Sequence, residues 1–513
     1  MRYCLAVALL LGAVCTPLAA QTESNLYLPI NSWATPYVEH LIRAGVLQGL
    51  EPLTRPLKRA DVARAVAAVD TTELSESVKS NLRLLAWELE EQPDTVRWKV
   101  EANVAALGAS DPSRWTVRPE RENTGVFYQG GLTGSLEFPH VAIVTSPYFD
   151  TRLKRDTQFV GNKKRFIAGD NSEAYMHASW KYLDLFFGIG PFNWGPPEVE
   201  GLILSTSPYP YDYFRASLGP RRFRLELVAT QLDNLFSTTT NSVDKRFLSA
   251  HRLVILPSDR LSFSLSEAAL YADKGEPNRS FEPWFLNPVN LWVLPNVNYV
   301  HAVNSLWGAD ASYLLGNGVR VAGQIYADDI RVDKDTVGEA PEQLGYTLSL
   351  TGGALRGQAS WSVFYTRVDN FNYRTRFNEE QYTIRGVGLA RDHDDYDQWT
   401  ARATVATMPR GLLTGELTFL RQGQGDPRKP LPAESLWGGR DSLTFLTGIV
   451  ERTLRVAAQA NWTPTPGLNL SADVGRHFIW NANHVRGVHA DRWVWRVRAE
   501  IRRRASGAIR WKD

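Results

Sequence analysis

The sequence contains almost no cysteine: two residues among 513, at positions 4 and 15. Both precede the predicted start of the mature chain, which therefore cannot rely on disulfides or on thiolate metal sites. The net charge is also small, +2 at pH 7, and removal of residues 1–20 takes away Arg2 and no acid, which leaves +1. Bulk charge therefore gives no reason to expect a nucleic-acid partner.

The first 20 residues predict an export signal. Arg2 precedes the apolar run 5–14, and the small residues around 18–20 give a cleavage point before Gln21. A lipid anchor is disfavoured, because Val14 rather than a small residue precedes Cys15. We expect residues 1–20 to be a signal peptide and the mature protein to be exported.

Long apolar runs are absent after the signal. No later segment has the length and composition of a membrane-spanning helix, and the chain has 11% aromatic residues but only three Met. If the protein enters a membrane, it does so as β-strands.

Alternating runs dominate the chain from residue 97 onward. Runs of about ten residues with one apolar face are separated by Gly, Pro, Asn and Asp, the pattern of a membrane β-barrel. The clearest are 222–232, 454–462, 468–474 and 493–502. Roughly 415 residues, at about 23 per strand with its connection, give about 16–18 strands. The sequence thus predicts a mainly β protein, with a large antiparallel transmembrane β-barrel over residues 96–513.

A soluble β-sandwich would alternate too. Several apolar faces are thin, however, since Ala458, Ala460 and Ala472 are small for a close-packed core yet acceptable toward lipid. We therefore favour the barrel. Its polar faces would line the lumen, and the predicted lumen-lining residues are Arg222, Arg224, Glu226, Arg455, Asp473, Arg496 and Arg498.

Glu267 breaks the alternation. It falls on the same face as Phe263 and Leu265, which would aim a carboxylate at lipid at a cost on the order of a few kcal/mol. We expect a β-bulge here or a position near the barrel rim.

Residues 24–95 do not show the alternation of the later strands. Their apolar residues recur at helical spacing instead. Helices are expected over 37–47, 58–69 and 72–91, the last ended by Pro93. A helical module that directly precedes a barrel lies on its periplasmic side.

The first half of this module resembles an S-layer homology motif. The matching segments are 32–34, 37–41, 44–49, 56 and 59–61. In that family such residues help to hold cell-wall polymers, which implies cell-wall contact through Trp33 and Arg59. Lys58 and Asp61 depart from the family pattern, and only one copy is present. The alternative is a helical hairpin that packs against or plugs the barrel mouth.

The stretch 183–220 carries the most information. It reads as strand, turn, strand, and the turn combines Trp194, the flexible Gly195 and two prolines that fix the backbone. Such a shaped aromatic loop is typical of a functional site.

This stretch begins a series of short motifs that resembles the capsule-assembly Wzi family of outer-membrane proteins. The motifs are 187–188, 194–196, 201–205, 210–213, 251–252, 266–267, 286–288, 308–310, 324, 328–330 and 365–368. The resemblance spans most of 97–500. It implies an outer-membrane barrel, preceded by a periplasmic helical element, that associates capsular or exopolysaccharide with the cell surface in a lectin-like, non-enzymatic way.

The side-chain chemistry of the loop agrees with this role. Sugar rings stack on Trp and Tyr, and sugar hydroxyls bond to Asp, Asn and Arg. The predicted polysaccharide-binding residues are Trp194, Tyr209, Tyr211, Asp212, Tyr213 and Arg215. The alternative is that these residues are girdle aromatics and loop packing.

Motifs of catalysis are missing, since the sequence has no Gly-x-Ser-x-Gly, no His-Glu-x-x-His and no phosphate-binding loop. We therefore expect no enzyme activity, cofactor or metal. The expected partners are capsular or exopolysaccharide, outer-membrane lipid and, through the helical module, a peptidoglycan-associated polymer. The alternative function is an outer-membrane channel for small or anionic solutes.

Overall fold

The computed structural model describes residues 24–90, 96–119, 123–164, 168–237, 241–273, 281–292, 303–329, 343–432 and 445–509. The predicted signal peptide and its cleavage point lie outside these residues. Within the described ranges, no helix combines the length and the apolar character needed to cross a membrane.

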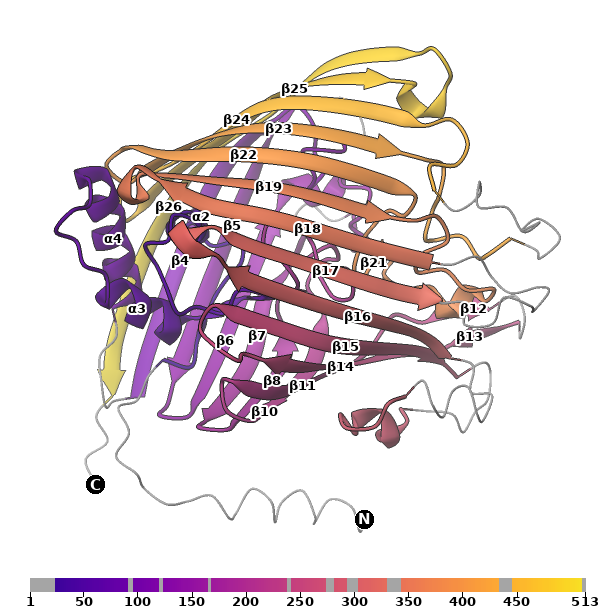
Figure 1. Cartoon of the computed structure of the whole chain (residues 1–513), viewed down its shortest axis with the longest axis horizontal. Helices are drawn as coiled ribbons and strands as arrows, with labels where there is room; N and C mark the ends of the chain where they lie inside the picture. Colours follow the sequence, from indigo (N-terminus) through magenta and orange to yellow (C-terminus); the bar gives the residue numbers. More distant parts are fainter. Residues whose placement is uncertain are drawn as a thin grey trace, which may run out of the picture.

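Eighteen antiparallel strands form one closed barrel (Figure 1). In chain order they are β4 (Val96–Ala109), β5 (Gly125–Glu137), β6 (Val141–Asp150), β7 (Gly169–Trp180), β8 (Leu183–Ile189), β10 (Asp212–Leu218), β11 (Phe223–Gln231), β14 (Arg246–Ile255), β15 (Leu261–Ala272), β16 (Val303–Leu314), β17 (Arg320–Asp329), β18 (Gln343–Ala354), β19 (Ala359–Val368), β22 (Tyr396–Met408), β23 (Gly411–Gln422), β24 (Glu451–Thr465), β25 (Leu468–Trp480) and β26 (His489–Ile509). The last strand closes the barrel on the first, with Ile509 opposite Val96. The predicted fold class and strand number are confirmed.

The two ends of the barrel differ. Short turns, such as 181–182 and 466–467, lie at the end that holds the helices, and long connections, such as 190–211 and 369–395, lie at the opposite end (Figure 1). Outer-membrane barrels have short periplasmic turns and longer extracellular loops. We call the end with the short turns the inner end and the other the outer end.

The strands alternate as the sequence predicts. On β26, Trp493, Val497 and Ile501 face outward and are 58%, 50% and 54% exposed, whereas Val494 and Glu500 between them are buried inside. A strand places successive side chains on opposite faces, and here one face meets the membrane side and the other the lumen.

Three helices precede the barrel: α2 (Thr35–Arg43), α3 (Arg59–Ala67) and α4 (Glu76–Leu89). All three overlap the predicted helices: α3 and α4 lie within the predicted bounds, whereas α2 begins two residues before position 37 and ends four residues before position 47. The Tyr37 hydroxyl of α2 donates to the Arg410 carbonyl at 2.7 Å, and His40 Nδ1 lies 2.8 Å from Ser360 Oγ. The helical module therefore packs against the barrel at its inner end, as one of the two sequence interpretations proposes.

Glu267 lies in the middle of β15, and the pairing of β15 with β14 and β16 runs through it without a bulge. The expected bulge or rim position is therefore wrong. The side chain shares the outward face of Leu265 but is only 2% exposed. Residues 281–292, with the short helix η2 (Pro283–Leu286), fold back along the outside of the wall (Figure 1).

The segment 281–292 shields this carboxylate from lipid. The Trp292 N–H donates to Glu267 Oε2 at 2.9 Å, and His251 Nε2 lies 3.2 Å from the same oxygen. Phe285 stacks on Tyr271 with ring centres 4.4 Å apart and adds an apolar contact to the wall. A buried charge tolerates a lipid-facing position when it is paired and hydrogen-bonded in this way.

Candidate functional site

The connection 190–211 turns into the barrel and fills part of the lumen. Its short strand β9 (Asn193–Trp194) pairs with β2 (Thr54–Arg55) from the N-terminal segment. The Gly195 N–H donates to the Leu53 carbonyl at 3.0 Å, and Gln324 Nε2 on β17 donates to the Trp194 carbonyl at 3.1 Å. The loop is thus fixed both to the N-terminal segment and to the wall.

Tyrosines from the outer connection 369–395 hold the same loop from the other side. The Tyr373 hydroxyl donates to the Leu202 carbonyl at 3.0 Å, and the Tyr382 hydroxyl donates to the Ile203 carbonyl at 2.9 Å. Leu202 and Ile203 are fully buried in the largest core cluster. This part of the lumen is therefore packed protein.

Most of the six predicted polysaccharide-binding residues are packed inside. Trp194 is fully buried, and Tyr211, Tyr213 and Arg215 are nearly so. Tyr213 stacks on Phe186 with ring centres 4.8 Å apart. Their contact with polysaccharide stays a prediction, and their burial favours the alternative of loop packing.

The other two differ from these four, because Asp212 is exposed and the buried Tyr209 lines a cavity. Asp212 is exposed at the first position of β10. Tyr209 lines a cavity of about 360 Å³, which we call the outer cavity. It is lined by Gln158, Phe159, Val160, Gly161, Gly169, Asp170, Tyr209, Ile384, Arg385 and Val387.

The outer cavity combines aromatic rings with paired charges. Tyr209 packs edge-to-face on Phe159, with centres 5.6 Å apart, and its hydroxyl donates to Asp156 Oδ2 at 2.6 Å. Burial raises the pKa of Tyr209, so its hydroxyl is a neutral donor at pH 7. Arg385 lies 4.0 Å from Asp170. This mixture of ring faces, donors and acceptors suits a sugar.

A second cavity of about 320 Å³ adjoins the first, and we call it the arginine cavity. It is lined by Arg114, Trp115, Thr116, Val117, Arg118, Glu198, Val199, Glu200, Ser207, Phe364, Arg391, Asp392, His393, Tyr396, Gln398, Arg402, Asp473 and Arg496. Two of these, Asp473 and Arg496, belong to the predicted lumen-lining set.

The two cavities share a wall. Arg114 of the arginine cavity lies 4.0 Å from the ring centre of Tyr209, and its Nη2 donates to Gln158 Oε1 at 3.1 Å. Gln158 Nε2 in turn donates to Asp392 Oδ2 at 2.6 Å. A chain-like ligand could therefore contact both cavities through neighbouring units.

The remaining lumen-lining predictions fall into two groups. Arg224, Glu226, Arg455 and Arg498 point inward and pair with acids or bases inside the barrel, for example Arg224 with Glu226 at 2.8 Å. Arg222 does not line the lumen. It lies in the turn before β11, with a side chain that is 68% exposed, because β11 starts one residue later than the alternating run predicts.

Trp33 and Arg59 both contact the chain itself. The Arg502 guanidinium lies 4.4 Å from the Trp33 ring centre, and Arg59 Nη1 lies 3.3 Å from Glu88 Oε1. These contacts hold the helical module to the barrel and to itself. Cell-wall contact through the two residues stays a prediction.

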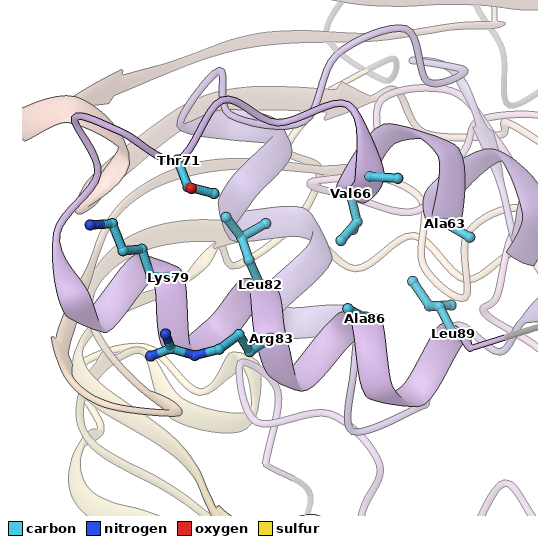
Figure 2. Close-up of a pocket in the computed structure, with 9 residues that line it drawn as sticks. Ala63, Val66, Thr71, Lys79, Leu82, Arg83, Ala86 and Leu89 are labelled. Atoms are coloured by element: carbon cyan, nitrogen blue, oxygen red, sulfur yellow. The ribbon is translucent and has the colours of Figure 1, made fainter.

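A groove of about 510 Å³ runs between α3 and α4 on this module (Figure 2). Its walls are mainly apolar, with Val66, Leu82 and Leu89 inside and Lys79 and Arg83 toward one end. It lacks the aromatic and acidic side chains of the two outer cavities, so we assign it no sugar-binding role.

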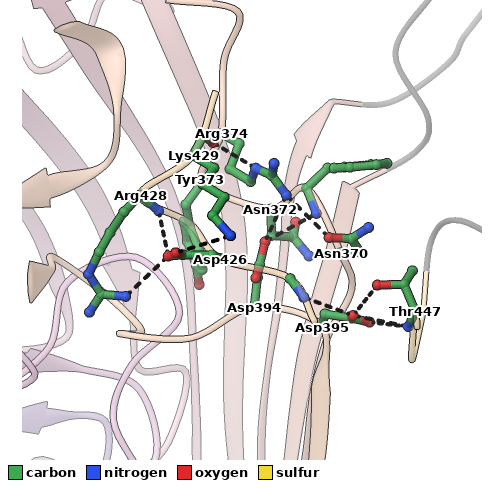
Figure 3. A network of polar contacts seen from close by, with 12 residues as sticks. Asn370, Asn372, Tyr373, Arg374, Asp394, Asp395, Asp426, Arg428, Lys429 and Thr447 are labelled. Carbon is green, nitrogen blue, oxygen red and sulfur yellow. Dashed lines mark hydrogen bonds and ion pairs between the residues drawn. The ribbon is translucent and has the colours of Figure 1, made fainter. Parts of the chain in front are cut away.

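A polar network ties together the connections at the outer end (Figure 3). Asp395 Oδ2 accepts from the Thr447 hydroxyl at 2.6 Å and from the Gly425 N–H at 3.1 Å. Arg374 Nε donates to the Lys429 carbonyl at 2.8 Å. Connections distant in sequence are thereby held in one arrangement above the arginine cavity's His393 and Asp392.

Asp394 is the member of this network whose carboxylate is least well compensated. Burial raises its pKa to about 8, with Asp395 and Asp426 adding to the rise and Arg374 opposing it. Its Oδ1 has no hydrogen-bond partner, and Arg374 Nη1 lies 3.8 Å from Oδ2. The folded state therefore prefers the neutral acid.

We expect Asp394→Asn to stabilise the protein at high pH. The pKa of Asp394 is higher in the folded state than in the unfolded state. The neutral acid therefore contributes its full stabilisation below the unfolded-state pKa, and this contribution is lost as the pH rises through the folded-state pKa of about 8. The loss is at most about 1.4 kcal/mol per pH unit. Thermal unfolding of detergent-solubilised protein at pH 5 and pH 9 measures it: the wild type should fall more than the variant.

Asp426→Asn is the matched control, because nearby Arg428 and backbone bonding lower the pKa of Asp426. That substitution should remove stability at neutral and high pH instead. Equal responses of the two variants to pH would contradict the assignment.

The arginine cavity was not found from the sequence. Arg118 follows β4 and Arg391 precedes β22, and no local pattern links two connections so far apart in the chain. The only available signal was the length of these connections, since long outer loops carry function more often than short turns.

No group of three or more His, Cys, Asp or Glu side chains in the described ranges is arranged to hold a metal ion. The expectation of no cofactor stays a prediction.

No protein-family model matches this chain, and no curated protein matches its sequence. Among solved structures it is similar to Wzi, described as an outer membrane protein involved in group 1 capsule assembly in Escherichia coli and as a carbohydrate binding beta-barrel. The TM-score is 0.60 at 14% identity, over 94% of this chain and 99% of that one.

Two Pseudomonas aeruginosa proteins match more weakly. OccK11 (OpdR) gives a TM-score of 0.44 at 9% identity, over 80% of this chain and 96% of that one. The outer membrane protein OprD gives 0.44 at 10% identity, over 80% and 94%. The match to Wzi shows the fold: this chain forms a Wzi-like β-barrel.

Proposed function

We propose that this protein holds capsular or exopolysaccharide at the bacterial outer surface as a lectin-like binder that catalyses no reaction. The observation that carries the proposal is the pair of adjoining cavities toward the outer end, above a lumen filled with protein. Wzi, whose solved structure has the same fold, is described as a carbohydrate binding beta-barrel, which agrees.

The chemistry of the cavities supports a sugar ligand. Tyr209 and Phe159 line the outer cavity, and Trp115 and Tyr396 line the arginine cavity. Each cavity also contains Arg and Asp or Glu side chains that can bond sugar hydroxyls. Sugars are bound by such combinations of ring stacking and hydrogen bonds.

The filled lumen supports a binder over the alternative channel. An open pathway through an 18-stranded wall would need the space that α2, β9 and the buried residues of 190–211 occupy. The inward charges are also largely paired with one another, as in Arg252 with Asp310 at 2.6 Å. These paired charges hold the segments inside the lumen in place.

The proposal places the barrel in the outer membrane, with the outer cavity facing the medium and the helical module in the periplasm. The short turns at the inner end and the long connections at the outer end support this orientation. Attachment of the module to a peptidoglycan-associated polymer is part of the proposal and rests on the S-layer-like motif alone. Failure of sacculi to retain the full-length protein would remove that part.

The test is the amount of polysaccharide that stays on the cells of a deletion strain. We expect the strain to release most of its cell-attached polysaccharide into the medium and to recover it when the wild-type gene is restored, while total synthesis is unchanged. A deletion strain that keeps all of its cell-attached polysaccharide would contradict the proposal.

A further inference from the structure

The arginine cavity holds more positive charge than its neighbours neutralise. Its lining includes Arg114, Arg118, Arg391, Arg402 and Arg496. Arg391 pairs with Glu200 at 3.1 Å and Arg402 with Glu416 at 2.8 Å. The other three have no carboxylate within 4.0 Å among the residues of the described ranges.

The acids of the cavity offset these three only in part. Arg428 neutralises Asp392, and Arg455 neutralises Asp473. Glu198, the fourth acid of the lining, has no ion pair within 4.0 Å in the described ranges and accepts from the Ser349 hydroxyl at 3.0 Å, so it can offset one charge. Burial, then Arg118 and Arg428, lower the pKa of His393 well below 6.5, so that this ring is neutral at pH 7. Two of the three positive charges are therefore left over.

The three guanidinium groups bond only to neutral partners. Arg118 Nη2 donates to Gln422 Oε1 at 3.3 Å, and Arg496 Nη1 donates to the Arg114 carbonyl at 3.0 Å. Arg114 Nη2 donates to the Ser207 carbonyl at 2.6 Å. A neutral oxygen satisfies a donor but compensates no charge, so each group gains further from an anion.

Two arginine N–H groups of the cavity have no acceptor among the described residues, which also favours the binding of an anion. Arg118 Nε is buried and has no hydrogen-bond partner, and Arg391 Nε, on a side chain only 4% exposed, has none either. Each unsatisfied buried donor costs about 1–3 kcal/mol, so an acceptor that enters the cavity would gain by bonding to these two.

Two of the guanidinium groups are held in place by rings. Arg118 lies 4.5 Å from the ring centre of Tyr396, and Arg114 lies 4.0 Å from that of Tyr209. A guanidinium stacked on a ring keeps its N–H edge available for a planar anion. Burial lowers the pKa of Arg118, and Tyr396, Glu200 and Asp392 oppose this shift.

We propose that the arginine cavity binds the carboxylate of an acidic sugar, with Arg118 and Arg496 as its principal ligands, so that the polysaccharide held by this protein is anionic. The inference rests on the proposed function and names the class of its ligand. The carboxylate accepts from the free guanidinium N–H groups. The ring of the same sugar lies toward Trp115 and Tyr396, and the next unit extends past Gln158 toward Tyr209.

The test compares two forms of one oligosaccharide: a galacturonic acid hexamer and its fully methyl-esterified form, which keeps the ring but lacks the charge. Binding to the purified full-length protein in detergent is measured by calorimetry at low and high salt. We expect the acidic form to bind at least about tenfold more tightly, as loss of charge-assisted bonds worth about 1.5–3 kcal/mol implies. The preference should shrink in high salt.

Substitutions in the cavity locate the site. Arg118→Gln and Arg496→Gln should each weaken the acidic form about tenfold and leave the ester unchanged, and Arg118→Lys should recover part of the loss. Arg222→Gln is the matched control, because that arginine is exposed in a turn at the inner end. Heat-dependent gel mobility confirms that each variant forms its barrel.

Equal affinity for acid and ester, or an acid preference that Arg118→Gln and Arg496→Gln leave intact, would overturn the inference. Neither outcome touches the proposed function, which the deletion strain tests separately. Inorganic sulfate that competes as strongly as the acidic hexamer would also overturn it, since the cavity would then bind a free anion rather than a sugar.

Discussion

The purified protein in a planar lipid bilayer should give no steady ionic conductance, and a variant with an emptied lumen should give a large one. An 18-stranded barrel encloses an aqueous channel when nothing fills it. Here α2 and the connection 190–211 occupy the lumen, and β2 pairs with β9 inside it. The barrel is therefore closed by protein segments packed inside its lumen.

The emptied variant can be designed without disturbing the wall. Ile189 and Asp212 are register partners on β8 and β10, so an Asn-Gly turn can join them in place of residues 190–211. Removal of residues 24–90 in the same variant takes away the helical module. We expect stable, long-lived conductance steps from this variant.

The control replaces the hairpin of β12 (Leu235–Ser237) and β13 (Ser242–Asp244), which lies at the outer end (Figure 1), by a short linker. It should remain closed like the wild type. Steady conductance of the wild type itself would support the alternative of a channel and count against the filled lumen.

The second large effect concerns Arg252, the main polar anchor of the lumen contents. Its side chain is fully buried, and it donates to Asp310 Oδ1 at 2.6 Å, to Ser264 Oγ at 2.9 Å and to Thr54 Oγ1 at 2.9 Å. Arg252→Met leaves the buried Asp310 carboxylate without its cation. Loss of one partner of a buried pair costs about 3–5 kcal/mol.

Urea unfolding in lipid or detergent measures this cost. The double variant Arg252→Met with Asp310→Asn should recover much of it, because the stranded charge is gone. The matched control is Arg356→Met, which breaks an exposed pair with Glu73 at the inner end and should cost no more than about 1 kcal/mol. Equal losses at the two sites would show that the Arg252 pair is not buried in solution.

The wall of the barrel was predictable from the sequence because its signal is local. A strand alternates with period two, so the inward position of Arg496 and the outward position of Trp493 follow from their neighbours alone. The predicted inward position of Arg222 was wrong for a related reason. Alternation does not mark where a strand begins, and β11 starts at Phe223.

The lumen and the cavities were not predictable in the same way. The loop around Trp194 has the composition of a sugar-binding loop. Trp194 nevertheless packs against the wall and the N-terminal segment, and composition does not distinguish a sugar-stacking ring from a packed one. The burial of Glu267 depends on the segment 281–292, which is distant in sequence and contributes the Trp292 N–H, so the neighbours of Glu267 could not predict it. Arg118 and Arg391 meet only because the barrel closes, which no local pattern records.

The central claim is that the outer cavities hold polysaccharide on the cell. The most direct measurement is the cell-attached polysaccharide of the deletion strain that carries either wild-type protein, a Tyr209→Ala/Gln158→Ala variant of the shared wall, or the remote control Tyr182→Ala. The account predicts full retention with the wild type and the control, and release of most polysaccharide with the cavity variant at equal amounts of inserted barrel. Full retention with the cavity variant would contradict it.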